Sequence, residues 1–150
     1  MINVIFTIAA GLMGTGGMTL VMWLIHRAGI ANADMVSAIG SMFTNSIEEA
    51  TTPGIIIHFI VGSLIAFIYV LLISLLGPSS VAATIGTGTM IGVFHGVAFS
   101  FLLVIAVAEH HPIEKFRNAG LEVAIAHFVG HVIYGLIVGT VIGITGVRFF

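Results

Sequence analysis

Cysteine is absent from this chain of 150 residues, and charged residues are scarce. The absence of cysteine excludes disulfide bonds and thiolate metal sites. Only 7% of the residues are charged, whereas 59% are hydrophobic and the mean hydropathy is +1.23. Because so few charges could not cover a surface that faces water, we expect the chain to be dissolved in lipid. Four basic residues against six acidic ones also argue against nucleic acid as a partner.

Four apolar stretches are long enough to span a bilayer, which takes about 20 residues. They cover residues 4–25, 54–76, 81–108 and 121–147. The second and third are joined by the short turn Gly77-Pro78-Ser79-Ser80, which makes them antiparallel neighbours. The sequence therefore predicts an all-α membrane protein, with residues 1–150 forming a single four-span antiparallel bundle.

A shorter helix is expected between the first and second spans. Asp34 is a good N-cap residue, and an apolar face follows it. This face contains Met35, Ile39, Met42 and Phe43. The pattern indicates a short amphipathic helix that lies in the membrane interface.

Glycines at every fourth position mark the third and fourth spans. Residues four apart lie on the same helix face, so each set forms a smooth groove that lets another backbone come close. The predicted packing positions are Gly88, Gly92 and Gly96 in the third span and Gly135, Gly139 and Gly143 in the fourth. We expect these two spans to pack through the grooves, on each other or on a partner.

The chain contains seven histidines, and their positions divide them into two groups. Three lie at the ends of spans, where an imidazole reaches water and needs no partner: His26, His110 and His111. Four lie within the spans: His58, His95, His127 and His131. Ionisable residues inside a bilayer are costly and mark a functional site by default.

The intramembrane histidines allow three kinds of site. His95 and His131, at matched depth on adjacent spans, could ligate the iron of a haem b group. A Zn, Cu or Fe ion could instead be held by His58, His127, His131 and Glu122, because histidines at positions i and i+4 share a helix face. The third use is a proton relay.

Hydrogen bonding offers a simpler role for each histidine taken alone. A neutral imidazole can bond a backbone carbonyl or a tyrosine across helices, and Tyr69 and Tyr134 are available. Such a bond stabilises a membrane bundle by about 1 kcal/mol. Haem is the least favoured ligand, because Gly96 and Gly135 beside the histidines allow only a narrow gap between helices. We therefore favour no cofactor.

Several enzyme classes are excluded by missing residues. His127-Phe128-Val129-Gly130-His131 lacks the glutamate of a zinc-protease helix. No Ser-His-Asp set, cysteine nucleophile or phosphate-binding loop occurs. The sequence thus predicts a protein that is not an enzyme.

Three segments carry a resemblance to a known family. They are AAGLMGTGGMTLVMWL in the first span, IIIHFIVGSLIAFIYVLL in the second and GHVIYGLIVG in the fourth. With their H-F-x-x-G and H-x-x-Y-G-x-x-x-G motifs, they resemble a family of small bacterial four-span membrane proteins of unknown function. The resemblance implies framework roles for His58 with Gly62, and for His131 with Tyr134 and Gly135. It implies no activity.

These features together predict a small non-catalytic membrane protein, an accessory or packing subunit of a larger membrane complex. Its expected partners are the lipid bilayer and either other membrane subunits or a second copy. The alternative function is a histidine site for a transition metal or haem that handles electrons, protons or metal. A small transporter or proton pathway is the third.

The basic residues predict an orientation in the bacterial inner membrane. Arg27, Lys115 and Arg117 fall on one side and Arg148 on the other, which places the charged loops in the cytoplasm and both termini outside. Because the chain has no cysteine, Ser79→Cys and Asn118→Cys each introduce a single label site. We expect a membrane-impermeant maleimide to label the first from outside and not the second; the reverse pattern means that the topology is inverted.

Overall fold

The computed structural model describes residues 3–150, except for the side chains at 102, 103, 105 and 106. Every regular element in this part of the chain is helical. The elements are α1 (Val4–Arg27), α2 (Met35–Thr44), α3 (Thr51–Leu76), α4 (Val81–Gly96), the π-helix η1 (Val97–Leu103), α5 (Val104–Glu109), α6 (Glu114–Arg117) and α7 (Leu121–Thr145). Four helical stretches within it are long and apolar enough to cross a membrane. The predicted all-α membrane fold, with a short helix between the first two spans, is confirmed.

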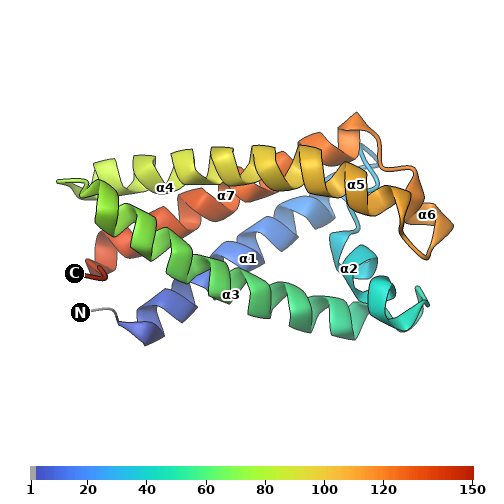
Figure 1. The fold of residues 1–150 in the computed structure, drawn as a ribbon, viewed down its shortest axis with the longest axis horizontal. Helices are drawn as coiled ribbons and strands as arrows, with labels where there is room; N and C mark the ends of the chain where they lie inside the picture. Colours follow the sequence, from blue (N-terminus) through green and yellow to red (C-terminus); the bar gives the residue numbers. More distant parts are fainter. Residues whose placement is uncertain (1–2) are drawn as a thin grey trace.

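The four long helices form an open arrangement. In Figure 1, α3 and α4 meet at the turn after Leu76 and then diverge, while α7 runs beside α4 and α1 crosses α3. Both termini lie at the end with this turn. The short helices α2 and α6 lie at the opposite end, beside α5. One end of the bundle is therefore closed by a tight turn, and the other by short helices.

The glycine grooves of α4 and α7 face each other. A Cβ atom added at Gly88 would lie 2.5 Å from the Cα of Gly139, and one added at Gly92 would lie 2.8 Å from the carbonyl oxygen of His131. Gly135 in turn faces the backbone of Gly88 and Gly92. Any side chain here would displace backbone, so these glycines let the two helices come into direct contact.

The remaining glycines of the two grooves lie at the ends of this contact. A Cβ at Gly96 would lie 3.0 Å from the Phe128 ring and 3.2 Å from the Cβ of His131. A Cβ at Gly143 would lie 3.3 Å from Val81. The contact is therefore tightest in the middle of the two helices and looser at both ends.

Helix α1 packs against two helices through glycines that face different ways. A Cβ at Gly11 would lie 2.6 Å from the Cα of Ser63 on α3, whereas one at Gly14 would lie 2.8 Å from the ring of Tyr134 on α7. The glycine-rich start of the chain is thus a helix that fits between α3 and α7.

The short helix α2 is held against the start of α3. The Asp34 carboxylate accepts a hydrogen bond from the Ser37 N–H at 3.2 Å, as expected for an N-cap. Gly40 faces the carbonyl of Ala50, and Gly54 faces the carbonyl of Val36, so the two backbones touch.

The apolar face predicted for α2 is only partly buried. Met35 is 7% exposed and Ile39 packs against the core, but Phe43 is 68% exposed. Phe43 therefore belongs to the outer surface rather than to the inner face.

The third span is not the regular α-helix expected over 81–108. The segment 97–103 is a π-helix, in which each backbone hydrogen bond spans five residues instead of four; this widens the coil and shifts the side chains that follow. It contains neither proline nor glycine, so no sequence signal marked it. The other spans differ from their expected bounds by a few residues at their ends.

Because α4 and α7 are in close contact, we expect alanine substitution at two glycines of α4 to change stability in different ways. Gly88→Ala should lower the free energy of unfolding by about 1–3 kcal/mol, because the added methyl group overlaps backbone. Gly86 has nothing within 4 Å of an added Cβ, so Gly86→Ala should be neutral or stabilising by up to about 1 kcal/mol. Thermal unfolding in detergent, followed by circular dichroism, measures both. Equal stability of the two variants would show that the helices do not touch at Gly88.

Candidate functional site

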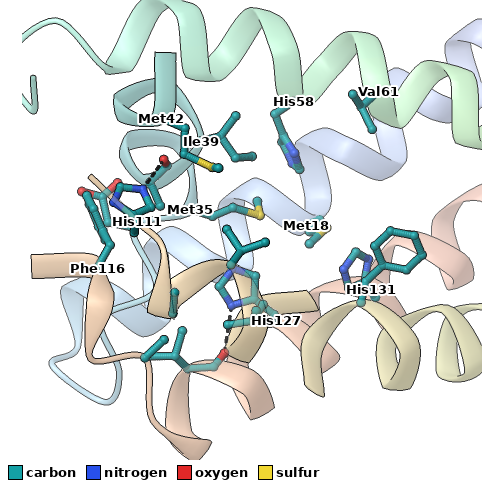
Figure 2. A pocket seen from close by; sticks show the side chains of 18 of the residues that line it. Met18, Met35, Ile39, Met42, His58, Val61, His111, Phe116, His127 and His131 are labelled. Atoms are coloured by element: carbon teal, nitrogen blue, oxygen red, sulfur yellow. Dashed lines mark hydrogen bonds between the residues drawn. The ribbon is translucent and has the colours of Figure 1, made fainter. Parts of the chain in front are cut away.

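A cavity of about 460 Å³ lies between the diverging helices, and all four intramembrane histidines line it. Figure 2 shows His58 on one wall with His127 and His131 on another. The rest of the lining is mostly apolar and includes Met18, Met35, Ile39, Met42, Val61, Ile65, Phe99, Val104, Val107, Phe116 and Val123. The cavity is partly open rather than enclosed. Histidines that are far apart in the sequence therefore share one space inside the membrane-spanning region.

Helix α7 fixes the orientation of His127. Its Nδ1 lies 2.8 Å from the carbonyl oxygen of Val123, one turn earlier in the same helix. A carbonyl oxygen only accepts hydrogen bonds, so Nδ1 carries the proton and donates it. Figure 2 shows this bond on the ring edge nearest the helix backbone. The Nε2 atom of the neutral ring is therefore an acceptor, on the edge that points away from the helix.

Aromatic rings surround the deep end of the cavity. The ring centroids of His95 and His131 lie 4.3 Å apart, and the Phe99 ring meets His95 edge-on at 4.7 Å. The Tyr69 hydroxyl lies 3.2 Å from Nδ1 of His95, which links α3 to α4. The π-helix begins directly after Gly96 and carries Phe99 in its first turn. The third span thus changes its winding where it reaches the cavity.

Tyr134 makes the shorter of the two hydrogen bonds that join spans in this cluster. Its hydroxyl donates to the carbonyl oxygen of Gly62 at 2.6 Å, joining α7 to α3. Its ring also meets Tyr69 edge-on, with centroids 5.3 Å apart. The sequence suggested interhelical bonding for His131, but its neighbour Tyr134 makes this bond instead.

Two histidine nitrogens that border the cavity are buried without a hydrogen-bond partner among the described residues: Nε2 of His58 and Nδ1 of His131. The hydroxyl of Ser100, in the π-helix, is unpaired in the same way. An unsatisfied buried polar atom costs about 1–3 kcal/mol, and lipid offers no water to reduce this cost. Groups of this kind call for a bound molecule or ordered water.

The end of the cavity near α2 and α6 is polar. Asp34 and Lys115 form an ion pair of 3.7 Å there, and the Asn32 side chain donates to the Lys115 carbonyl at 3.1 Å. Both charged side chains are partly exposed, so the pair contributes little stability. It nevertheless ties the start of α2 to α6.

His111 was expected to face water without a partner, and this expectation is wrong. The residue is 3% exposed. Its Nε2 donates to the carbonyl oxygen of Ala38 on α2 at 2.9 Å, while its Nδ1 accepts from the Ile113 N–H at 3.1 Å. His111 therefore fastens α2 to the segment after α5. The sequence hid this role because the partner, Ala38, lies 73 residues away.

A preformed metal site is not found among the described residues, where no three His, Asp or Glu side chains come together closely enough to hold an ion. Glu122 is exposed and is not part of the cavity lining. It lies at the start of α7, where its carboxylate turns back towards Gly120. The predicted set of three histidines with Glu122 is thus divided between two places.

His95 and His131 do not fit a haem group between them. Their rings touch directly, whereas axial ligands of one iron stand on opposite faces of a macrocycle. The narrow gap results from the glycine contact that continues through Gly92 and Gly96.

A model of a protein family matches residues 1–148, and its description is "Family of unknown function (DUF6789)". The chain belongs to this family. Searches with this chain find no significant match among curated proteins or among solved structures. The predicted membership of an uncharacterised family is confirmed, whereas a bacterial origin and the two histidine motifs remain predictions. In this DUF6789 protein, the histidine-lined cavity is the structural feature that bears most directly on function.

Because His111 bonds to Ala38, we expect α2 of the DUF6789 protein to open locally when this hydrogen bond is removed. His111→Phe should speed amide hydrogen exchange in α2 by about tenfold, because one net hydrogen bond is lost. The control is Glu109→Gln, at an exposed position at the end of α5. Exchange followed by mass spectrometry in nanodiscs measures both. Unchanged exchange in the first variant would show that His111 does not hold α2.

Proposed function

We propose that this protein is a non-catalytic membrane protein that binds a small, largely apolar molecule in the histidine-lined cavity. The observation that carries the proposal is the cavity of about 460 Å³, at whose walls two imidazole nitrogens have no partner among the described residues. Ligand sites in proteins have volumes of about 300–1,000 Å³, with apolar walls and a few polar groups that orient the ligand. The cavity has both properties.

The open arrangement of the spans supports access from the lipid. Helices α3 and α4 touch near their turn and diverge beyond it (Figure 1), and the cavity takes lining residues from α3 on one side and from α4, η1 and α5 on the other. A lipid-soluble molecule would reach such a cavity sideways, without crossing water. The paired charges of Asp34 and Lys115 lie at the end nearest the aqueous phase.

Binding accounts for features that packing alone leaves unexplained. A pure packing subunit gains nothing from unpaired buried nitrogens, because apolar side chains of similar size would avoid their cost. Exposed apolar side chains on the long helices contact lipid as readily as protein, so they do not favour an accessory role over a binding role. The accessory role and the transport or proton-pathway role remain hypotheses that are compatible with a bound molecule.

Native mass spectrometry of the purified protein tests the proposal. We expect the wild-type protein to retain a small molecule from the membrane in a fraction of its copies. Val61→Trp should abolish this fraction, because Val61, although 49% exposed, lines the open cavity (Figure 2) and an indole there would occupy part of it. The matched control is Leu64→Trp on the same helix, because Leu64 is similarly exposed at 62% but does not line the cavity.

The comparison of the two tryptophan variants decides the outcome. Retention by wild type and Leu64→Trp, with loss in Val61→Trp, supports a ligand in the cavity. Retention that is equal in all three proteins, or absent from all three, contradicts the proposal. Circular dichroism of each variant verifies that the helices remain folded.

A further inference from the structure

We infer that the cavity selects a neutral aromatic molecule with a hydroxyl group, of the lipophilic phenol or hydroquinone class, and that His127 accepts a hydrogen bond from this hydroxyl. The inference rests on the proposed function and names the class of ligand. Three observations carry it: the fixed tautomer of His127, the placement of charge, and the thioether wall opposite α7.

The tautomer of His127 favours a ligand that donates a hydrogen bond. Because Nδ1 donates to the Val123 carbonyl at 2.8 Å, the neutral ring offers only a bare Nε2 lone pair to the cavity. A hydroxyl group can donate to this lone pair. A quinone, ketone, ester or ether presents only acceptors, and two acceptors facing each other repel. His127 therefore distinguishes a phenol from its methyl ether.

The placement of charge favours a neutral ligand. Among the described residues, the charged side chains that line the cavity are Asp34 and Lys115, and they pair with each other at one end. Within the described part of the chain, no counterion for a charged ligand remains beside the four histidines. An unpaired ion in an apolar membrane site is costly, so the ligand is neutral where it meets the histidines.

Methionines favour a flat aromatic ring. Met18 from α1, with Met35 and Met42 from α2, lines the cavity across from His127 (Figure 2). Methionine sulfur makes favourable contacts with aromatic ring edges, and the flexible side chain adapts to the ring. Phe99 and Phe116 add aromatic surface at the two ends of the cavity. An aromatic head group is thus enclosed by thioethers and rings.

His58 lies across the cavity from His127 and gives the ligand a second polar contact. Its Nε2 is buried without a partner in the described part of the chain, so its tautomer is not fixed by the protein. It can donate to or accept from a second oxygen, which suits either a phenol or a hydroquinone. The selection for a hydroxyl therefore depends on His127.

Two probes that differ in one proton donor test the inference: 1-naphthol and 1-methoxynaphthalene. Both dissolve in lipid and have the same rings. Equilibrium dialysis against dimyristoylphosphatidylcholine nanodiscs, with empty nanodiscs as the correction for partition, measures their binding to the full-length protein. We expect wild type to bind 1-naphthol about tenfold more tightly than its ether, as one net hydrogen bond implies. His127→Phe should bring this ratio close to one, and the control His26→Phe, outside the cavity, should keep it.

A second measurement keeps the inference testable if His127→Phe fails to fold. The ¹⁵N NMR shifts of labelled histidine in the wild-type protein distinguish a protonated from a bare ring nitrogen. We expect His127 to have a protonated Nδ1 and a bare Nε2, and the Nε2 resonance to move when 1-naphthol is added. The resonance is assigned by its loss in His127→Gln.

Each outcome decides a different statement. Equal binding of the two probes by wild type, tighter binding of the ether, or a protonated Nε2 on His127 overturns the inference. If Val61→Trp nevertheless abolishes probe binding, the cavity remains a binding site and the proposed function survives. If neither probe binds wild type saturably, the hydroxyl class is wrong, and the proposed function is then decided by the mass spectrometry alone.

Discussion

Direct backbone contact between α4 and α7 is the constraint on which the rest of the structure depends. At Gly88 and Gly135 the two helices are so close that neither position has room for a Cβ atom. In lipid, where apolar surface gives little drive for association, such contact supplies dispersion and excludes lipid from the interface. Helix α3 is joined to α4 by a short turn at one end and contacts α1 where the two helices cross, around Gly62 and Ser63. It can therefore diverge from α4 at the other end, and this divergence leaves room for the cavity.

The histidine cavity and the glycine contact impose opposite demands on the same helices. Packing favours small residues and full satisfaction of polar atoms, whereas the cavity keeps nitrogens of His58 and His131 unpaired within the described structure. Natural sequences break local rules of this kind mainly at functional sites. The π-helix η1 is another departure from regular structure at this site. It begins where the glycine contact ends, and it brings Phe99 to the cavity wall. The site is thus built where the packing regularity stops.

The sequence predicts the parts of this fold that depend on local periodicity. Span length, the N-cap Asp34 and the one-sided glycines follow from spacing along a single helix. The shared cavity of His58 with His127 does not, because it depends on the angle between α3 and α7. The role of His111 was also not predictable from local spacing, because its partner Ala38 lies 73 residues away in the sequence. Glu122 is grouped with the histidines by its position along the fourth span. In the structure it lies in the first turn of α7, where its side chain turns back towards Gly120.

Chemically identical histidines take different roles because the backbone already uses some of their nitrogens. His111 uses both ring nitrogens in holding α2, so it has no free nitrogen for a ligand. His127 uses one for the Val123 carbonyl and His95 uses one for Tyr69, which leaves each with a single nitrogen for the cavity. In His58 and His131 a buried nitrogen remains unpaired among the described residues. Among the described residues, the histidines that line the cavity beside the spans therefore keep a ring nitrogen for a ligand, whereas His111 at its α2 end has none.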